Sequence, residues 1–155
     1  MLTRTRTLSP DSAGSGYGAT IVVVKAARDL VDAHRRLHGS VLRFLSRFDD
    51  AGRAVRERPQ PLETLVGQLE KKARAAGFAR MRELSATVQA AREAARQREW
   101  LFADSFGTDA PALQEAARAL ERLDATLVGL CVEHVLQTTA PRAAKSRARR
   151  TRQDN

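Results

Sequence analysis

The sequence has few aromatic residues and a single cysteine, and both shortages limit what it can build. Phe, Trp and Tyr make up 5% of the 155 residues, so a core must consist mainly of Leu, Val and Ala. Such a core suits packed helices better than a sheet, in which β-branched and aromatic residues dominate. The one cysteine, Cys131, excludes an internal disulfide framework and fits a reducing compartment.

Long apolar segments are absent as well. The longest run, residues 19–24, is interrupted by Thr20 and is far shorter than the ~20 residues that span a bilayer. Residues 1–18 contain two arginines but no apolar segment of the kind that a secretory signal needs. We therefore expect a cytoplasmic protein without a membrane span.

Motifs for catalysis and for cofactor binding are missing. The glycines near the N-terminus do not form a phosphate-binding loop, and no serine lies in a nucleophile-elbow context. Asp49 and Asp50 are adjacent, so on a helix they would point ~100° apart and could not act as a carboxylate dyad. Other carboxylates have an Arg at helical spacing, as Glu93 has Arg96, and such pairs are ordinary on helix surfaces. The sequence predicts a protein that is not an enzyme and carries no cofactor.

Every histidine and cysteine of the chain falls into one of two pairs with helical spacing. His34 and His38 are four residues apart, and Cys131 and His134 are three apart. If the two helices faced each other at the same height, these four side chains could close a tetrahedral zinc site. Alternatively, the histidines pack in the core or along a helix seam, and Cys131 is a small buried apolar residue. The sequence leaves both interpretations open, and we assign no metal site.

Two segments rich in helix-breaking residues divide the chain. Prolines at 59–61 and a glycine followed by a capping aspartate at 107–109 predict helices over about 20–58, 62–106 and 110–140.

Gly77 either ends a helix inside the middle segment or marks a phase slip within it, so the chain has three long helices or four. Short connections favour an all-α, antiparallel up-down bundle over residues 19–141. A disordered leader, 1–18, precedes this bundle, and a basic disordered tail, 142–155, follows it.

The first helix has a long apolar stripe. Its apolar residues alternate steps of four and three from Val23 to Val55, and only His34 interrupts them. This period is typical of coiled-coil-like packing. One functional hypothesis is therefore a structural or adaptor protein that oligomerises or binds a partner protein through this face.

The net charge of +9 is concentrated near the C-terminus. Residues 142–155 hold six basic residues and one acidic residue, which amounts to +5. In the first helix, Arg36, Arg43 and Arg47 recur at steps of seven and four on one side. This pattern predicts sequence-independent contacts with the phosphate backbone of DNA or RNA, whereas the alternative is a solvated polar face and a solubilising end.

Our principal hypothesis is a non-enzymatic accessory or scaffold subunit that binds nucleic acid inside a larger assembly. The predicted nucleic-acid-binding residues are Arg36, Arg43, Arg47, Arg142, Lys145, Arg147, Arg149, Arg150 and Arg152.

Overall fold

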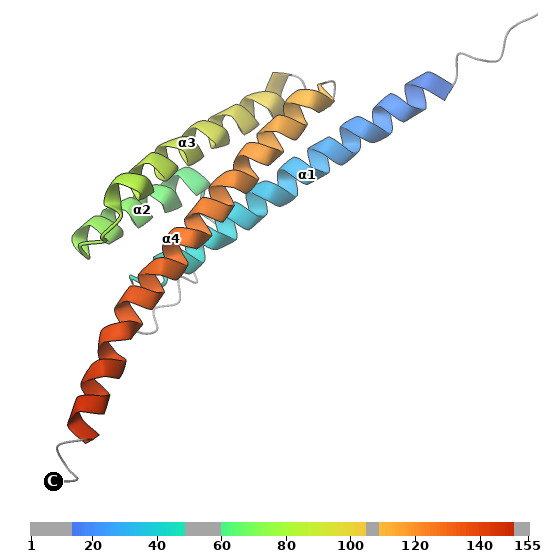
Figure 1. Ribbon diagram of the computed structural model, residues 1–155. Helices are drawn as coiled ribbons and strands as arrows, with labels where there is room; N and C mark the ends of the chain where they lie inside the picture. The colour runs from blue at the N-terminus through green and yellow to red at the C-terminus, as the bar shows by residue number, and fades with distance from the viewer. Residues whose placement is uncertain (1–13, 49–59, 105–108, 151–155) are drawn as a thin grey trace, which may run out of the picture.

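The computed structural model describes residues 14–48, 60–104 and 109–150, and these ranges form four α-helices without a strand (Figure 1). The helices are α1 (Gly14–Leu45), α2 (Leu62–Ala75), α3 (Met81–Asp104) and α4 (Ala110–Arg150). The all-α fold expected from the sequence is confirmed. Within the described ranges, no helix has a stretch both long and apolar enough to cross a membrane.

Gly77 separates α2 from α3, which decides between three helices and four. Its φ of +66° is the left-handed conformation that glycine adopts without steric cost. The N–H of Phe78 donates to the carbonyl of Ala73 at 2.9 Å, and the N–H of Gly77 donates to that of Arg74 at 3.1 Å. These two bonds form a Schellman motif, which ends a helix and satisfies its last carbonyls. The middle segment is therefore a helical hairpin.

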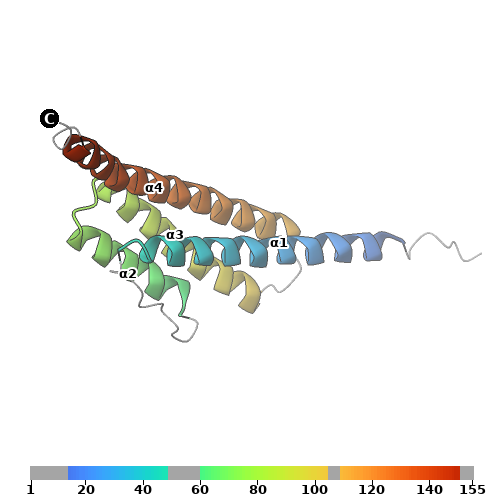
Figure 2. The ribbon, with the colours of Figure 1, turned by 90° about the horizontal axis from the view of Figure 1, so that it is seen from below.

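The four helices form a bundle in which each packs against two others. α1 contacts α2 and α4, and α3 contacts the same two helices from the other side (Figures 1 and 2). α3 is antiparallel to α2 and α4, as expected for short connections. α1, however, runs parallel to both α2 and α4: Arg36 meets Glu121, and further along both helices Phe44 meets His134.

The parallel course of α1 differs from the strict up-down order that we expected. α1 ends at Leu45, well before residue 58, and turn hydrogen bonds continue the chain to Phe48. The connection to α2 therefore spans 46–61, which at up to ~3.3 Å per residue can return the chain along α1. The expected helical residues 49–58 lie outside the described ranges.

The first helix begins earlier and the last helix ends later than expected. α1 begins at Gly14 instead of Thr20, and α4 continues through Pro141 to Arg150 instead of ending near residue 140. Proline removes one backbone hydrogen bond from a helix, but the Ala, Arg and Lys residues that follow are strong helix formers. The described part of the C-terminal segment is thus helical, while residues 1–13 and 151–155 lie outside the described ranges.

The core takes up the apolar stripe of α1. Leu30, Leu37, Val41 and Phe44 are at most 1% exposed. They pack within one cluster against side chains from the other three helices, namely Leu65, Leu69, Leu84, Val88, Leu120 and Leu130. Burying each such side chain stabilises the fold by roughly 1.5–3 kcal/mol before entropic costs. As far as residue 48, this stripe is therefore covered by the bundle itself and does not form an open surface.

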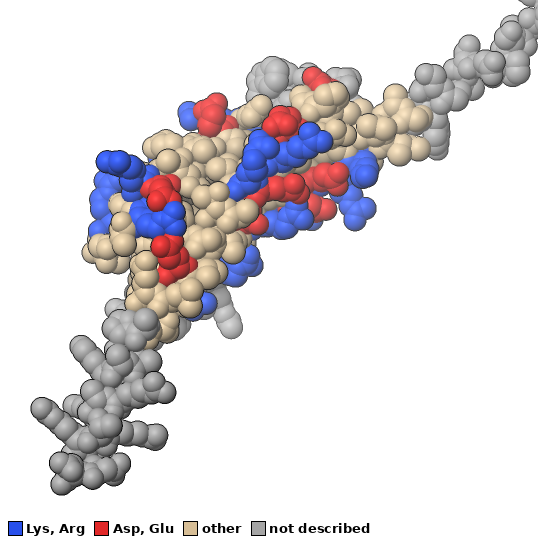
Figure 3. All heavy atoms as spheres, in the orientation of Figure 1, with Lys and Arg blue, Asp and Glu red and all other residues tan. Residues whose placement is uncertain are grey.

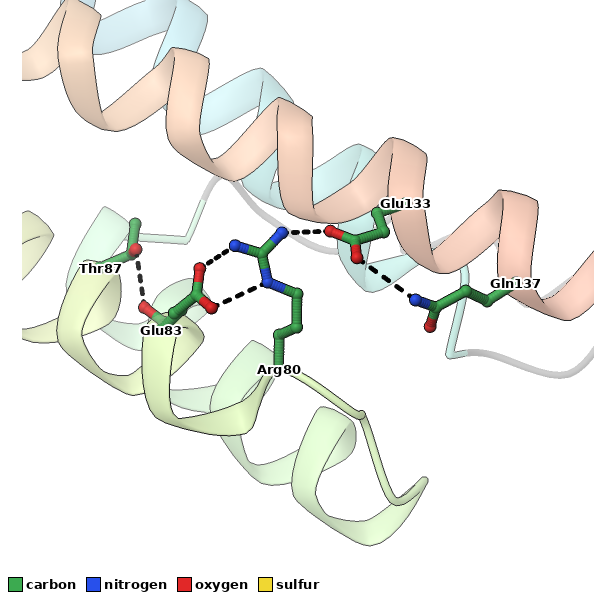
Figure 4. Close-up of polar contacts among 5 residues, drawn as sticks. All are labelled: Arg80, Glu83, Thr87, Glu133 and Gln137. Carbon is green, nitrogen blue, oxygen red and sulfur yellow. Dashed lines mark hydrogen bonds and ion pairs between the residues drawn. The ribbon is translucent and has the colours of Figure 1, made fainter.

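An arginine next to α3 links α3 to α4. Figure 4 shows the guanidinium of Arg80 between Glu83, in the first turn of α3, and Glu133 on α4. Its Nε donates to Oε1 of Glu83 at 2.9 Å, and Glu133 also accepts a bond from Gln137 at 3.3 Å. These hydrogen bonds raise the pKa of Arg80 and lower that of Glu83. Because the groups are exposed, these ion pairs contribute little to the stability of the fold.

Candidate nucleic-acid interface

Arg43 and Arg47 lie near the C-terminal end of α1, on the side that faces α4. Both are exposed, and both lie close enough to Cys131 of α4 to lower the pKa of its thiol. Nη2 of Arg43 donates to Oγ of Ser40 at 2.8 Å. Within the described ranges neither arginine pairs with a carboxylate. Their guanidinium groups therefore retain donors that can bind an external anion.

Arg36, the third arginine of the predicted stripe, has a different environment. Its Nη2 lies 2.6 Å from Oε1 of Glu121, and this ion pair joins α1 to α4. Further towards the N-terminus, Asp32 lies 3.7 Å from Arg28 and 3.9 Å from Arg35. Carboxylates thus lie beside Arg28, Arg35 and Arg36, whereas none in the described ranges pairs with Arg43 or Arg47.

The parallel course of α1 and α4 brings the two predicted basic features to the same end of the molecule. α4 passes Arg47 at Cys131 and then continues beyond the end of α1 (Figures 1 and 2). At ~1.5 Å per residue, Arg142 follows ~16 Å further along α4, and Arg150 follows ~28 Å further. In an up-down bundle of four helices, the C-terminal ends of α1 and α4 would lie at opposite ends of the molecule.

The side chains of the predicted C-terminal residues lie outside the described part of the structure. The backbone of residues 142–150 belongs to α4, and Arg152 lies beyond the described ranges. The residues concerned are Arg142, Lys145, Arg147, Arg149, Arg150 and Arg152.

Charges of both signs lie close together on α3 and on the first half of α4. Figure 3 shows basic and acidic side chains next to one another over α3 and the first half of α4. Glu115 lies 2.9 Å from Arg122 and 3.8 Å from Arg118, and the hydrogen bond with Arg122 is the main reason why its pKa is lowered. A groove of about 690 Å³ between α1 and α4 is also lined by both signs, for example by Lys25 and Asp29. This mixed surface does not favour an anionic ligand.

The histidines and the cysteine do not converge on one site. The rings of His34 and His38 are 6.4 Å apart, and Nε2 of His38 lies 2.9 Å from the carbonyl oxygen of Gln60. His134 instead stacks on Phe48 with ring centroids 4.9 Å apart, further along α1 and near Cys131 on α4. No group of three or more potential metal ligands occurs in the described ranges. The four residues considered for zinc therefore belong to two separate environments.

Burial shifts the pKa values of two of these residues, His34 and Cys131. Desolvation, followed by the charge of Arg98 and then by His38, lowers the pKa of His34 from 6.5 to about 4. Desolvation also raises the pKa of the Cys131 thiol, against the opposing effect of Arg47 and Arg43. Since a protonated thiol is a poor nucleophile, Cys131 does not have the properties of a reactive cysteine.

Sequence reasoning missed a second apolar face on α4. Leu127 and Leu130 are buried, but Val128, Val132 and Leu136 are exposed. The steps of four between these three residues are visible in the sequence, although the stronger buried stripe of the same helix obscures them.

Comparisons with protein-family models, with curated proteins and with solved structures found no match to this chain.

Proposed function

We propose that the protein is a non-enzymatic accessory or scaffold subunit that binds nucleic acid through backbone phosphates. One observation carries this proposal: Arg43 and Arg47, which have no carboxylate partner in the described ranges, lie at the end where α4 continues into its basic segment. Guanidinium groups donate two parallel hydrogen bonds to phosphate oxygens and stay charged at all physiological pH values. A cytoplasmic location and membership of a larger assembly are parts of the same proposal.

The proposed contact is electrostatic and independent of base sequence. Each phosphate that an arginine or lysine neutralises releases condensed counterions, so affinity falls as the salt concentration rises. The basic residues of 142–155 supply most of this attraction, and Arg43 and Arg47 extend it onto the folded body. Arg36 stays bound to Glu121 and serves to hold α1 against α4.

The test measures binding of a mixed-sequence DNA duplex to the full-length protein by fluorescence anisotropy. Between about 50 and about 200 mM salt, log K should fall linearly with log salt, at about 0.9 per phosphate contacted. Replacing both arginines (Arg43→Gln with Arg47→Gln) should reduce this slope by up to about 2. Replacing the six basic residues of 142–155 by Gln should reduce it by up to about 5.

A matched control removes the same charge elsewhere on the surface. Arg118 and Arg122 are exposed on α4 and share Glu115 as their partner. The double variant Arg118→Gln with Arg122→Gln should keep the wild-type slope. An affinity that does not change with salt, or equal losses in this control and in the Arg43 and Arg47 variant, would contradict the proposal.

A further inference from the structure

The second half of α4 carries an apolar face that the bundle does not cover. Val128 is 41% exposed, Val132 is 52% exposed and Leu136 is 63% exposed. Steps of four residues place these three side chains, here called the α4 stripe, on one side of the helix. Figure 3 shows that the surface over this part of α4 is largely uncharged. Aliphatic side chains in such a row are typical of a helix surface that packs against another helix.

Gly129 lies beside the α4 stripe and has no explanation within the molecule. Glycine in the interior of a helix is less stable than alanine because it loses more backbone entropy on folding. A Cβ built at Gly129 would meet no atom within 4 Å, so packing inside the bundle does not require its absence. A second helix lying over the stripe would come closer to α4 beside a glycine than beside a larger residue, because the distance between two packed helices depends on the side chains at their contact.

The two edges of the α4 stripe carry different charges, and the edge next to α1 is positive. On the α1 side lie Arg43 and Arg47, which have no carboxylate partner in the described ranges. On the other side, Arg80 is shared between Glu83 and Glu133, so these three groups together carry one negative charge. A partner that covers the stripe would therefore encounter two arginines along one edge.

We propose that the α4 stripe docks an acidic amphipathic helix of a partner protein. The apolar residues of that helix pack on Val128, Val132 and Leu136, and its carboxylates pair with Arg43 and Arg47. This is the helix-on-apolar-face mode of recognition, with charge complementarity selecting the partner. An antiparallel two-fold pairing of the stripe with a second copy would instead place the two arginines of one copy beside those of the other. The stripe also lacks the aromatic residues and the width of a helix face that inserts into lipid.

The experiment measures the binding of two synthetic helical peptides to the full-length protein by isothermal titration calorimetry. Both peptides carry leucines at helical spacing; one has glutamates on the flanks, and the other has lysine at every glutamate position. The glutamate peptide should bind and the lysine peptide should not. The double variant Val132→Ser with Leu136→Ser should weaken binding on the order of tenfold or more. As a control, Val24→Ser, at an α1 residue that is 62% exposed, should leave binding unchanged.

Two further variants test the charge pairing and the role of Gly129 separately. Reversing the charges with Arg43→Glu and Arg47→Glu should make the protein bind the lysine peptide in place of the glutamate peptide. Gly129→Ala should raise the melting temperature of the free protein while weakening peptide binding.

Three results would overturn the proposal. The first is equal binding of both peptides, or binding of neither. The second is self-association of the wild type that Val132→Ser abolishes, because the occupant would then be a second copy. The third is binding to phosphatidylserine vesicles that Val132→Ser abolishes, because the occupant would then be a membrane surface. Both proposals use Arg43 and Arg47, but none of these measurements uses nucleic acid, so a failure here is distinguishable from a failure of the proposed phosphate contacts.

Discussion

The titration of His34 gives the most detailed prediction for stability. Its ring is half-buried on α1 and faces Arg98 of α3, and its pKa is lowered to about 4 from 6.5. Above pH 6.5 the ring is neutral in both the folded and the unfolded chain. Between pH 6.5 and pH 4 the His34 ring is protonated in the unfolded chain but stays largely neutral in the folded chain. The free energy of unfolding should therefore fall as the pH falls through this window.

The size of this effect follows from the two pKa values and from the burial of the ring. The difference between 6.5 and about 4 corresponds to about 3 kcal/mol for a fully shielded group. Because the ring is half-buried, solvent screening should leave about 1–2 kcal/mol. Leucine at the same position cannot take up a proton, so His34→Leu should lack this part of the pH dependence.

Urea denaturation followed by circular dichroism measures the effect at about pH 7.5 and at about pH 4. The wild type should lose about 1–2 kcal/mol more between these two conditions than His34→Leu, since all other titrating groups are shared. An NMR titration should place the midpoint of the His34 ring well below 6.5, and Arg98→Met should move it upwards by removing a positive charge. Equal losses in both proteins, or a midpoint near 6.5, would refute this reasoning.

Two substitution series test the backbone and the core. Gly77→Ala should cost roughly 1–2 kcal/mol, because an L-residue at a φ of +66° is strained although a Cβ there has space. Gly77→Asn should recover part of that loss, and a Gly77→Ala variant as stable as the wild type would show that this strain is absent. Leu37→Ala should cost about 2–5 kcal/mol in chemical denaturation, since Leu37 is 1% exposed. Leu42→Ala, at a position on the same helix that is 37% exposed, should cost much less, and equal losses would contradict the assigned core.

Local signals in the sequence predicted most of the helical structure. Proline before Leu62 and glycine at position 77 have direct effects on backbone geometry, and both mark helix ends in the structure. The apolar stripe of α1 was predicted from its periodicity, and its members from Leu30 to Phe44 are buried. The end of α4 was not predicted, because a single Pro141 competes with strong helix formers on its C-terminal side.

The direction of α1 could not be predicted from local patterns. A period of 3.5 residues specifies which face of a helix is buried but is the same for parallel and antiparallel neighbours. The direction is decided by contacts between distant residues, such as those of Arg36 with Glu121 and of Phe44 with His134. The same contacts separate the two pairs of potential metal ligands, which the sequence alone could not place at different heights.

The candidate interface shows the same division between local and distant determinants. Arg36, Arg43 and Arg47 share one side of α1, and sequence spacing alone makes them equivalent. Glu121 distinguishes them, because its carboxylate neutralises Arg36 across the α1–α4 contact and leaves the other two arginines for an external partner. The parallel α4 then adds its basic segment at the end where those two arginines lie. The clustering of basic residues at one end thus arises from helix direction as much as from the number of arginines, since an antiparallel α4 with the same residues would separate the two basic segments by the length of the bundle.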